Sequence, residues 1–151
     1  MTAALALPDV EATAALGARL APLLAGGGLV ALRGELGAGK TSLVRAVLQA
    51  MGHAGAVRSP TYALAEPYLI GGLEVWHLDL YRIADPQELE LLGLRDWLRP
   101  GVLVLVEWPE RAAGWLPPAD LEVLLEHDGE GRRVHLSGPL ASRLEPVAAR
   151  A

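Results

Sequence analysis

The sequence predicts an α/β fold, in which a mostly parallel central sheet carries flanking helices and β-hairpin additions. Residues 29–32 form a short apolar run of the kind found in buried parallel strands, and residues 102–106 form another. Residues 42–48 place apolar side chains at positions 43, 44, 47 and 48, which is the spacing of one helix face. Helices interleaved with apolar strands indicate a sheet that is covered on both faces and binds ligands at the carboxyl ends of its strands.

The elements on either side of the first apolar run follow from local signals. Residues 9–24 have helical apolar spacing, and Asp9 is placed to cap the amino end of that helix. Three glycines at positions 26–28 then end the helix before the strand at 29–32. Gly52 lies just beyond the helix predicted at 42–48, where a helix commonly ends. The first third of the chain therefore predicts a helix, a strand and a second helix.

The rest of the chain predicts two hairpins, a short helix and a buried strand. The segment 58–61 is a loop that leads into an extended stretch ending at Leu69, and Gly71-Gly72 predicts a tight turn into residues 73–81. Asp85 and Pro86 suit the N-cap and first position of a short helix. The remaining elements are a buried strand at 101–106 and a hairpin formed by residues 120–126 and 133–136.

Length and composition limit the classes of function. The 151 residues predict a single domain, 1–151, with a loosely attached tail after about residue 138. A net charge of −5 argues against a broad nucleic-acid-binding surface, and the lack of cysteine excludes disulfides and thiolate chemistry. The apolar start has no charged n-region, and no apolar run approaches the roughly 18 residues of a membrane span. We expect a soluble, cytoplasmic protein without a membrane anchor.

Residues 34–41, Gly-Glu-Leu-Gly-Ala-Gly-Lys-Thr, match the phosphate-binding P-loop pattern G-x-x-x-x-G-K-[ST]. The glycines let backbone N–H groups turn toward an anion, and the following helix adds its positive end. Lys40 is the only lysine of the chain and is placed to reach the β- and γ-phosphates, while the Thr41 hydroxyl is placed to hold Mg²⁺. The residues expected to bind the nucleotide are Glu35, Leu36, Gly37, Ala38, Gly39, Lys40 and Thr41.

The apolar run 102–106 ends in Glu107, which is the Walker B pattern. A carboxylate at the end of a central strand lies near the mouth of a P-loop, where it holds Mg²⁺ or orients the attacking water. A strand-end glutamate that simply meets solvent is the alternative. Trp108 follows Glu107 and is expected to point to the opposite side of the strand, into packing or an interface.

Alternation along residues 76–82 places His77, Asp79 and Tyr81 on one strand face. A polar face at a strand end suits a nucleotide site, so Asp79 is a candidate acid; a solvated edge strand is the alternative. His77 is expected to be a hydrogen-bonding structural residue. Ser59-Pro60-Thr61 forms a candidate switch loop that senses the γ-phosphate, with an ordinary turn as the alternative.

These segments together resemble a known family. GELGAGKT at 34–41, SPTY at 59–62, HLDLYR at 77–82, DPQELELLGLRDWL at 85–98 and EWPER at 107–111 are similar, in order and spacing, to TsaE proteins, also called YjeE. The resemblance covers roughly residues 9–137. A P-loop alone is shared by many families, whereas the HxDLYR and EWPE segments are far more specific.

The resemblance implies a small bacterial P-loop ATPase that binds ATP or ADP with Mg²⁺ and has weak activity alone. Such proteins work with TsaD and TsaB, which transfer a threonylcarbamoyl group to the adenosine next to the anticodon of tRNA, so that contact with tRNA is indirect. Hydrolysis of ATP resets that machinery between turnovers. No motif identifies the adenine contacts, for which the segment around Asp9-Val10 and the residues near Arg132 are candidates.

The resemblance also implies roles for single residues. Lys40 and Thr41 are the phosphate and Mg²⁺ ligands, and Glu107 is the Walker B-like metal residue. Asp79 is a functional acid of the site, and Thr61 belongs to the switch-like segment. The catalytic residues are then Lys40, Glu107, Asp79 and Thr61, and Trp108 is the tryptophan of the family's EW pair.

Two other nucleotide-binding classes and a binding module are the alternatives to a TsaE-like ATPase. A Ras-like GTPase reads guanine through Asn-Lys-x-Asp, which this chain lacks because it has no asparagine and its lysine is in the P-loop. In a small-molecule kinase, Asp79 would deprotonate a substrate hydroxyl while Arg82 or Arg111 clamps phosphates, but no segment reads as an arginine-rich lid. In a nucleotide-gated binding module, the ATP state would control docking to a partner.

Overall fold

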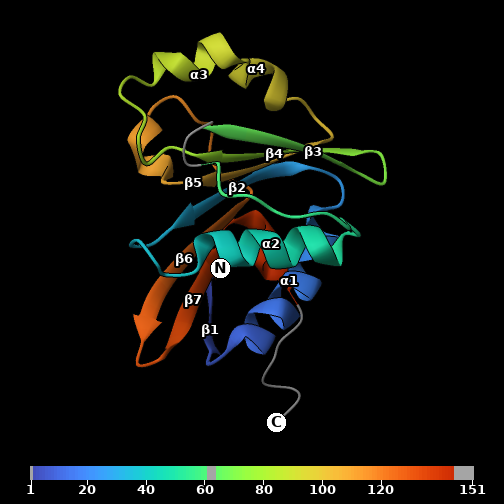
Figure 1. The fold of residues 1–151 in the computed structure, drawn as a ribbon, viewed down its shortest axis with the longest axis vertical. Helices are drawn as coiled ribbons and strands as arrows, with labels where there is room; N and C mark the ends of the chain where they lie inside the picture. Colours follow the sequence, from blue (N-terminus) through green and yellow to red (C-terminus); the bar gives the residue numbers. More distant parts are fainter. Residues whose placement is uncertain (1, 61–63, 145–151) are drawn as a thin grey trace.

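The structure, a computed structural model, describes residues 2–60 and 64–144. Its centre is a seven-stranded sheet with the strand order β1-β7-β6-β2-β5-β4-β3 (Figure 1). The strands are β1 (Thr2–Leu7), β2 (Gly28–Arg33), β3 (Ala65–Ile70), β4 (Leu73–Asp79), β5 (Val102–Glu107), β6 (Leu121–Asp128) and β7 (Gly131–Ser137). The helices are α1 (Val10–Leu24), α2 (Lys40–Ala50), α3 (Gln87–Leu92) and α4 (Leu94–Trp97), with short 3₁₀ turns η1 (Pro109–Ala112) and η2 (Pro139–Arg143).

The middle of the sheet is parallel and its edges are antiparallel. β2 lies between β5 and β6 and runs parallel to both, and β4 runs parallel to β5. The hairpins β3–β4 and β6–β7 supply the antiparallel pairs that extend this core. The predicted α/β fold, with a parallel core and hairpin additions, is confirmed. The short helix α3 begins at Gln87, one residue later than predicted, and the Asp85 carboxylate accepts a hydrogen bond from the Gln87 N–H at 3.0 Å.

Helices cover both faces of the sheet, as the sequence predicts (Figure 1). On one face, α1 and α2 enclose the larger core, whose buried side chains come mainly from α1, α2, β2, β5 and β6. The two helices approach so closely that a Cβ atom added at Gly17 would lie 2.6 Å from the Cβ of Ala46. On the other face, α3, α4 and η1 pack over a second core that contains the stacked rings of Trp76 and Trp97. β5 is buried along its whole length because it faces both cores.

The amino-terminal strand β1 is an element that the sequence analysis did not predict. β1 pairs antiparallel with β7 from Thr2 opposite Ser137 to Leu7 opposite Arg132. Its sequence is rich in alanine, which has little preference for strands, so local pattern gives a weak signal. The strand forms because β7 offers an unpaired edge, and Leu7 is buried against the sheet. In the parts of the chain that the structure describes, no helix has the length and apolar character needed to span a membrane.

Candidate nucleotide site

A glycine-rich loop joins the carboxyl end of β2 to the amino end of α2. Gly37 and Gly39 have φ angles of 76° and 105°, a left-handed conformation that favours glycine. Gly34 lies so close to β6 that a Cβ atom there would be 2.6 Å from the carbonyl oxygen of Leu125. The glycines of the P-loop pattern are therefore required both by the turn itself and by its close approach to the sheet. The strand, loop and helix occur in the order that this pattern requires.

Lys40 lies at the first position of α2 and is 5 % exposed. Its Nζ atom donates to the carbonyl oxygen of Gly34 and lies 3.5 Å from that of Glu35. The same atom lies 3.8 Å from the centre of the Trp108 ring, a cation–π contact. Burial lowers the pKa of the Lys40 ammonium below its usual value, although the negative charge of Glu107 opposes that change. The ammonium thus lies inside the loop, where two carbonyl oxygens partly compensate its positive charge. The negatively charged oxygens of a phosphate would compensate that charge more fully.

The sheet register brings the two predicted carboxylates together. Asp79 of β4 pairs directly with Glu107 of β5, and Glu107 pairs on its other side with Leu32 of β2, just before the P-loop. Both acids are almost fully buried, with Asp79 7 % and Glu107 3 % exposed. Parallel strands end at the same edge of a sheet, so Asp79, Glu107 and the P-loop meet at one place.

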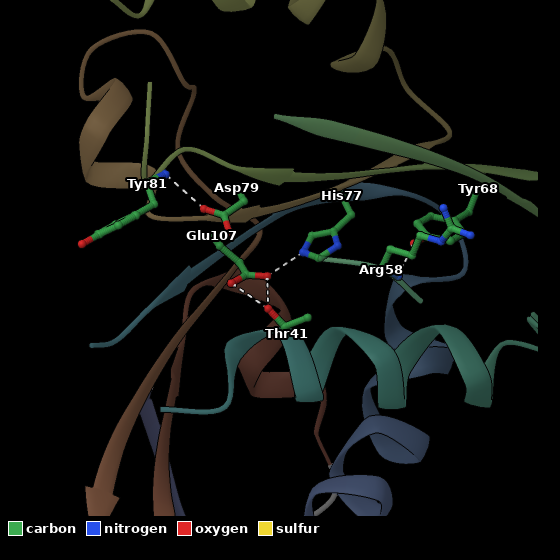
Figure 2. A network of polar contacts seen from close by, with 7 residues as sticks. All are labelled: Thr41, Arg58, Tyr68, His77, Asp79, Tyr81 and Glu107. Atoms are coloured by element: carbon green, nitrogen blue, oxygen red, sulfur yellow. Dashed lines mark hydrogen bonds and ion pairs between the residues drawn. The ribbon is translucent and has the colours of Figure 1, made fainter. Parts of the chain in front are cut away.

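Glu107 is the centre of a hydrogen-bonded network (Figure 2). The Thr41 hydroxyl lies 3.1 Å from Oε1 and 2.9 Å from Oε2 of Glu107. His77 Nε2 lies 2.6 Å from Oε2 of the same carboxylate, and His77 is fully buried. An ionised carboxylate only accepts hydrogen bonds, so Nε2 carries the proton and donates it. The network fixes Glu107 in an orientation that faces Thr41.

His77 therefore makes the hydrogen bond that the sequence predicts, and its partner is a site carboxylate. Its Nδ1 atom is buried and has no hydrogen-bond partner among the described residues. A neutral ring with its proton on Nε2 leaves only a lone pair at Nδ1, which is less costly to bury than an unpaired N–H group.

Asp79 is held next to this network by the chain that follows it. Its Oδ1 atom accepts a hydrogen bond from the Tyr81 N–H at 3.0 Å. Burial raises the pKa of the Asp79 carboxyl group above its usual value, and the charge of Glu107 raises it further, whereas the Tyr81 N–H opposes the change. A buried acid with a raised pKa beside a phosphate-binding loop has the properties of a group that accepts or orients a proton-bearing ligand.

Trp108 packs against the second core, as the sequence predicts, but the prediction that it points away from Glu107 is wrong, because it also lines the site. Strand β5 ends at Glu107, and Trp108 has a left-handed backbone with φ 59° and ψ 50°, so strand alternation no longer applies to it. Its ring lies over Lys40 and also contacts the Tyr81 ring, with centroids 4.9 Å apart. The Arg111 guanidinium lies 5.4 Å from the Tyr81 ring centre. Trp108 therefore forms a wall of the site.

These groups surround a cavity of about 260 Å³, which we call the phosphate cavity. Its lining is Leu36, Gly37, Gly39, Lys40, Thr41, Ser42, Ser59, Asp79, Tyr81, Glu107 and Trp108. A second cavity of about 330 Å³, which we call the base cavity, shares Gly39 and Ser42 with the first. Asp9, Val10, Thr13, Arg45 and Arg132 are among the residues that line it. The two cavities adjoin at the first turn of α2, where they share Gly39 and Ser42.

Comparison with known proteins identifies the family. A family model described as threonylcarbamoyl adenosine biosynthesis protein TsaE matches residues 7–135, which is most of the chain. This chain belongs to the TsaE family. The TsaE protein of Haemophilus influenzae is 48% identical over 108 residues, covering 72% of this chain and 68% of that protein. The TsaE protein of Nostoc sp. is 38% identical over 132 residues, covering 84% of this chain and 80% of that protein.

A solved structure has the same fold. The crystal structure of YdiB from Bacillus subtilis superposes with a TM-score of 0.79 and 24% sequence identity, covering 99% of this chain and 93% of that one. At this level of identity the likeness shows a shared fold. The resemblance to TsaE proteins that the motifs predict is confirmed by the family match.

The structure gathers most of the predicted site residues of this TsaE-family chain and adds others. Lys40, Thr41, Asp79 and Glu107 line one cavity, and Ser59 of the predicted switch segment lines it too. Thr61 lies outside the described residues. The candidate segment Asp9-Val10 and Arg132 both line the base cavity. The cavities are also lined by Ser42, Thr13 and Arg45, which lie on α1 and α2 and which the motifs do not single out.

Proposed function

We propose that this chain is a Mg²⁺-dependent ATP-binding and ATP-hydrolysing protein that acts with TsaD and TsaB in forming N6-threonylcarbamoyladenosine next to the anticodon of tRNA. One observation carries the ATPase part of the proposal: Lys40, Thr41, Asp79 and Glu107 face one cavity at the carboxyl edge of the parallel strands. Such an edge is where α/β proteins bind nucleotides. The pathway part rests on membership of the TsaE family.

In this proposal the P-loop binds the phosphates of ATP. Backbone N–H groups of residues 35–41 and the amino end of α2 form a positive pocket for them. The Lys40 ammonium turns from the carbonyl oxygens of Gly34 and Glu35 to the β- and γ-phosphate oxygens. Its lowered pKa reflects burial, and phosphate charge would compensate for that burial. Lys40 thus supplies both affinity and charge stabilisation during phosphoryl transfer.

Thr41 and Glu107 are the residues that would hold Mg²⁺. Mg²⁺ prefers oxygen ligands and keeps several waters when it binds beside phosphates, and these two side chains supply oxygens that are already 2.9 Å apart. When bound, the ion neutralises charge on the phosphates. Glu107 accepts a hydrogen bond from the Thr41 hydroxyl, and a hydrogen bond from His77 in turn holds Glu107 in place. The chain therefore presents its metal-binding oxygens in a fixed geometry.

We assign to Asp79 the task of orienting the attacking water. Its carboxyl group lines the phosphate cavity next to Glu107 and has a raised pKa, so it is a better proton acceptor than a solvated aspartate. Trp108 and Tyr81 wall off this end of the cavity. Thr61, which the family motif marks as switch-like, completes the list of residues to which we assign a catalytic role.

We place the adenine ring in the base cavity. That cavity meets the phosphate cavity at Gly39 and Ser42, so a nucleotide whose phosphates lie on the P-loop would extend into it. Its lining combines apolar groups such as Val10 and Ala14 with the polar side chain of Thr13, a mixture that suits a purine. This position agrees with the adenine candidates at Asp9-Val10 and near Arg132.

The role with TsaD and TsaB follows the family. Hydrolysis of ATP by this chain would reset the TsaD–TsaB pair after each transfer of the threonylcarbamoyl group, in the cytoplasm, with contact to tRNA only through these partners. The acidic net charge of −5 agrees with an indirect role. Activity alone would be weak and would rise when the partners bind.

Counting tRNA modifications per TsaD molecule tests the pathway role. Purified TsaD and TsaB are supplied with tRNA and a threonylcarbamoyl donor, with or without this chain and Mg²⁺-ATP. We expect about one modification per TsaD without the chain and many with it. Equal yields in both reactions would contradict the role. In the control reaction, Lys40→Met protein replaces the wild-type chain. It shows whether a chain with an inactive P-loop has any effect on the yield.

A small-molecule kinase remains the second candidate, because Asp79 lines the phosphate cavity with a raised pKa, as a base for an acceptor hydroxyl would. The two reactions differ in where the γ-phosphate goes. Free phosphate released from ATP in buffer indicates a hydrolase. A phosphorylated small molecule recovered from a metabolite mixture, with no free phosphate in buffer, would indicate the kinase.

A further inference from the structure

Arg132, at the start of β7, donates hydrogen bonds to the P-loop across 94 and 95 residues of sequence. Its Nε atom lies 3.1 Å from the carbonyl oxygen of Ala38, and its Nη2 atom lies 3.0 Å from that of Gly37. Its Nη1 atom lies 2.8 Å from the carbonyl oxygen of Gly131. All three partners are backbone carbonyl oxygens. Arg132 belongs to the lining of the base cavity but not to that of the phosphate cavity.

The sheet holds Arg132 firmly in this place. β7 lies between β1 and β6, and Arg132 pairs with Leu7 on one side and His127 on the other. The neighbouring Gly131 packs so closely on the chain before α1 that a Cβ atom there would lie 2.8 Å from the Cα of Pro8. The guanidinium therefore reaches the P-loop from a rigid strand and not from a free loop.

The geometry of the peptide group gives these hydrogen bonds a consequence for phosphate binding. In a trans peptide the C=O and N–H bonds point in opposite directions. A donor that holds the Ala38 carbonyl therefore directs the Gly39 N–H to the other side of the loop, and Gly39 lines the phosphate cavity. Hydrogen bonds from a guanidinium are charge-assisted and stronger than neutral ones. The positive charge behind the loop also favours anions in front of it.

Lys40 and Arg132 contact different carbonyl groups of the loop. Lys40 contacts those of Gly34 and Glu35, and in the proposed function it turns to the phosphates. Arg132 contacts those of Gly37 and Ala38 and, unlike Lys40, does not line the phosphate cavity. We propose, on the basis of the proposed function, that Arg132 is a positioning residue that holds the P-loop in its phosphate-binding conformation.

The experiment measures two affinities for each variant in the absence of Mg²⁺: that of ADP, and that of inorganic pyrophosphate in competition with ADP. Pyrophosphate has no base, so it reports on the P-loop alone. Arg132→Met removes the charge and both P-loop hydrogen bonds. We expect it to weaken ADP and pyrophosphate alike, by about tenfold or more. Arg133→Met is the matched control, because Arg133 pairs with Asp128 on the exposed end of the same hairpin, and we expect it to change neither affinity.

A second variant and a local readout separate positioning from general stability. Arg132→Lys keeps the charge but lacks the planar fork that reaches two carbonyls, so we expect a smaller loss for both ligands. In nucleotide-free Arg132→Met, hydrogen exchange of the backbone amides should become faster at residues 37–39. The strands of the sheet should keep their protection from exchange. If Arg132→Met fails to fold, Arg132→Lys decides the question by the same two affinities.

Three results would overturn the inference. Unchanged affinities in the Arg132 variants would show that the hydrogen bonds do not matter for binding. A loss for ADP with unchanged pyrophosphate affinity would make Arg132 a base contact. An equal loss in Arg133→Met would reduce the effect to net charge. Failure of the wild-type protein to bind ADP would instead contradict the proposed function, so the two failures are distinguishable.

Discussion

The Thr41 hydroxyl lies 2.9 Å from Oε2 of Glu107 and 3.1 Å from Oε1, which joins the P-loop to the end of β5. The two residues are 66 positions apart in the sequence, and their contact depends on β2 and β5 being parallel neighbours. His77 contacts the same carboxylate from β4. Three strands of the sheet thus determine how the proposed metal-binding oxygens are oriented.

Replacing Glu107 tests the centre of this network. In Glu107→Gln the carboxylate becomes a neutral amide, which is a weaker metal ligand. We expect the rate of ATP hydrolysis to fall by about 100-fold or more, while ADP affinity without Mg²⁺ changes by only a few fold. Steady-state phosphate release and ADP titration measure the two effects. The control is Glu122→Gln, which removes a half-exposed carboxylate paired with Arg33. An unchanged rate in Glu107→Gln would remove Glu107 from the mechanism.

The hydrogen bond from His77 to Glu107 predicts a change in the requirement for Mg²⁺. His77→Leu removes the donor, and a ligand that has lost its supporting hydrogen bond binds metal about 10- to 100-fold more weakly. We expect the Mg²⁺ concentration for half-maximal hydrolysis to rise accordingly. His77→Gln keeps an N–H donor and should recover part of the loss. A drop in melting temperature with no change in the Mg²⁺ requirement would mean that His77 only supports the fold.

The raised pKa of Asp79 predicts that this residue opposes stability at neutral pH. The folded protein binds the proton of Asp79 more tightly than the unfolded chain does. In the unfolded chain the pKa of the Asp79 carboxyl group is near 3.8. Its favourable contribution is therefore fully present below that pH and is lost as the pH rises through the folded-state pKa. At neutral pH, Asp79→Asn should have a higher melting temperature than wild type, and the difference should shrink toward pH 3.8.

The same substitution should slow hydrolysis by at least about tenfold, because the introduced amide cannot accept a proton from water. The Tyr81 N–H keeps its acceptor, so the local structure should be preserved. Melting curves at several pH values and phosphate release give the two answers. A large fall in melting temperature with normal specific activity would instead favour a structural role for Asp79.

The contact between Lys40 and Trp108 predicts an optical signal of nucleotide binding. The Lys40 ammonium lies 3.8 Å from the Trp108 ring, and in the proposed function it turns to the phosphates. We expect ADP to change tryptophan fluorescence in wild type and in Trp115→Phe, and the change to be lost in Trp108→Phe. Lys40→Met should lower ADP affinity by about tenfold or more. A fluorescence change that persists in Trp108→Phe would contradict this assignment.

Local patterns were sufficient where a residue type has one structural use. The P-loop needs glycine at positions with left-handed φ, such as Gly37 and Gly39, so its sequence predicts its shape. The apolar run 102–106 predicts a buried strand because only a central strand buries both faces. The P-loop and the Walker B strand were therefore predictable from short windows of sequence.

Contacts between distant segments were not predictable in this way. The pairing of Asp79 with Glu107 depends on strand order, which the sequence does not encode locally. The hydrogen bonds from Arg132 to the P-loop depend on the β6–β7 hairpin folding beside β2. Trp108 was misplaced because alternation was extended one residue beyond the end of β5, where the backbone becomes left-handed.

The measurement that tests the central claim most directly is phosphate release from Mg²⁺-ATP by this chain, alone and with the TsaD–TsaB pair from the same source. The proposed function predicts slow release alone, strong stimulation by the pair, and loss of the stimulated rate in Glu107→Gln. Absence of stimulation, with folded protein that binds ADP, would contradict a partner-activated ATPase.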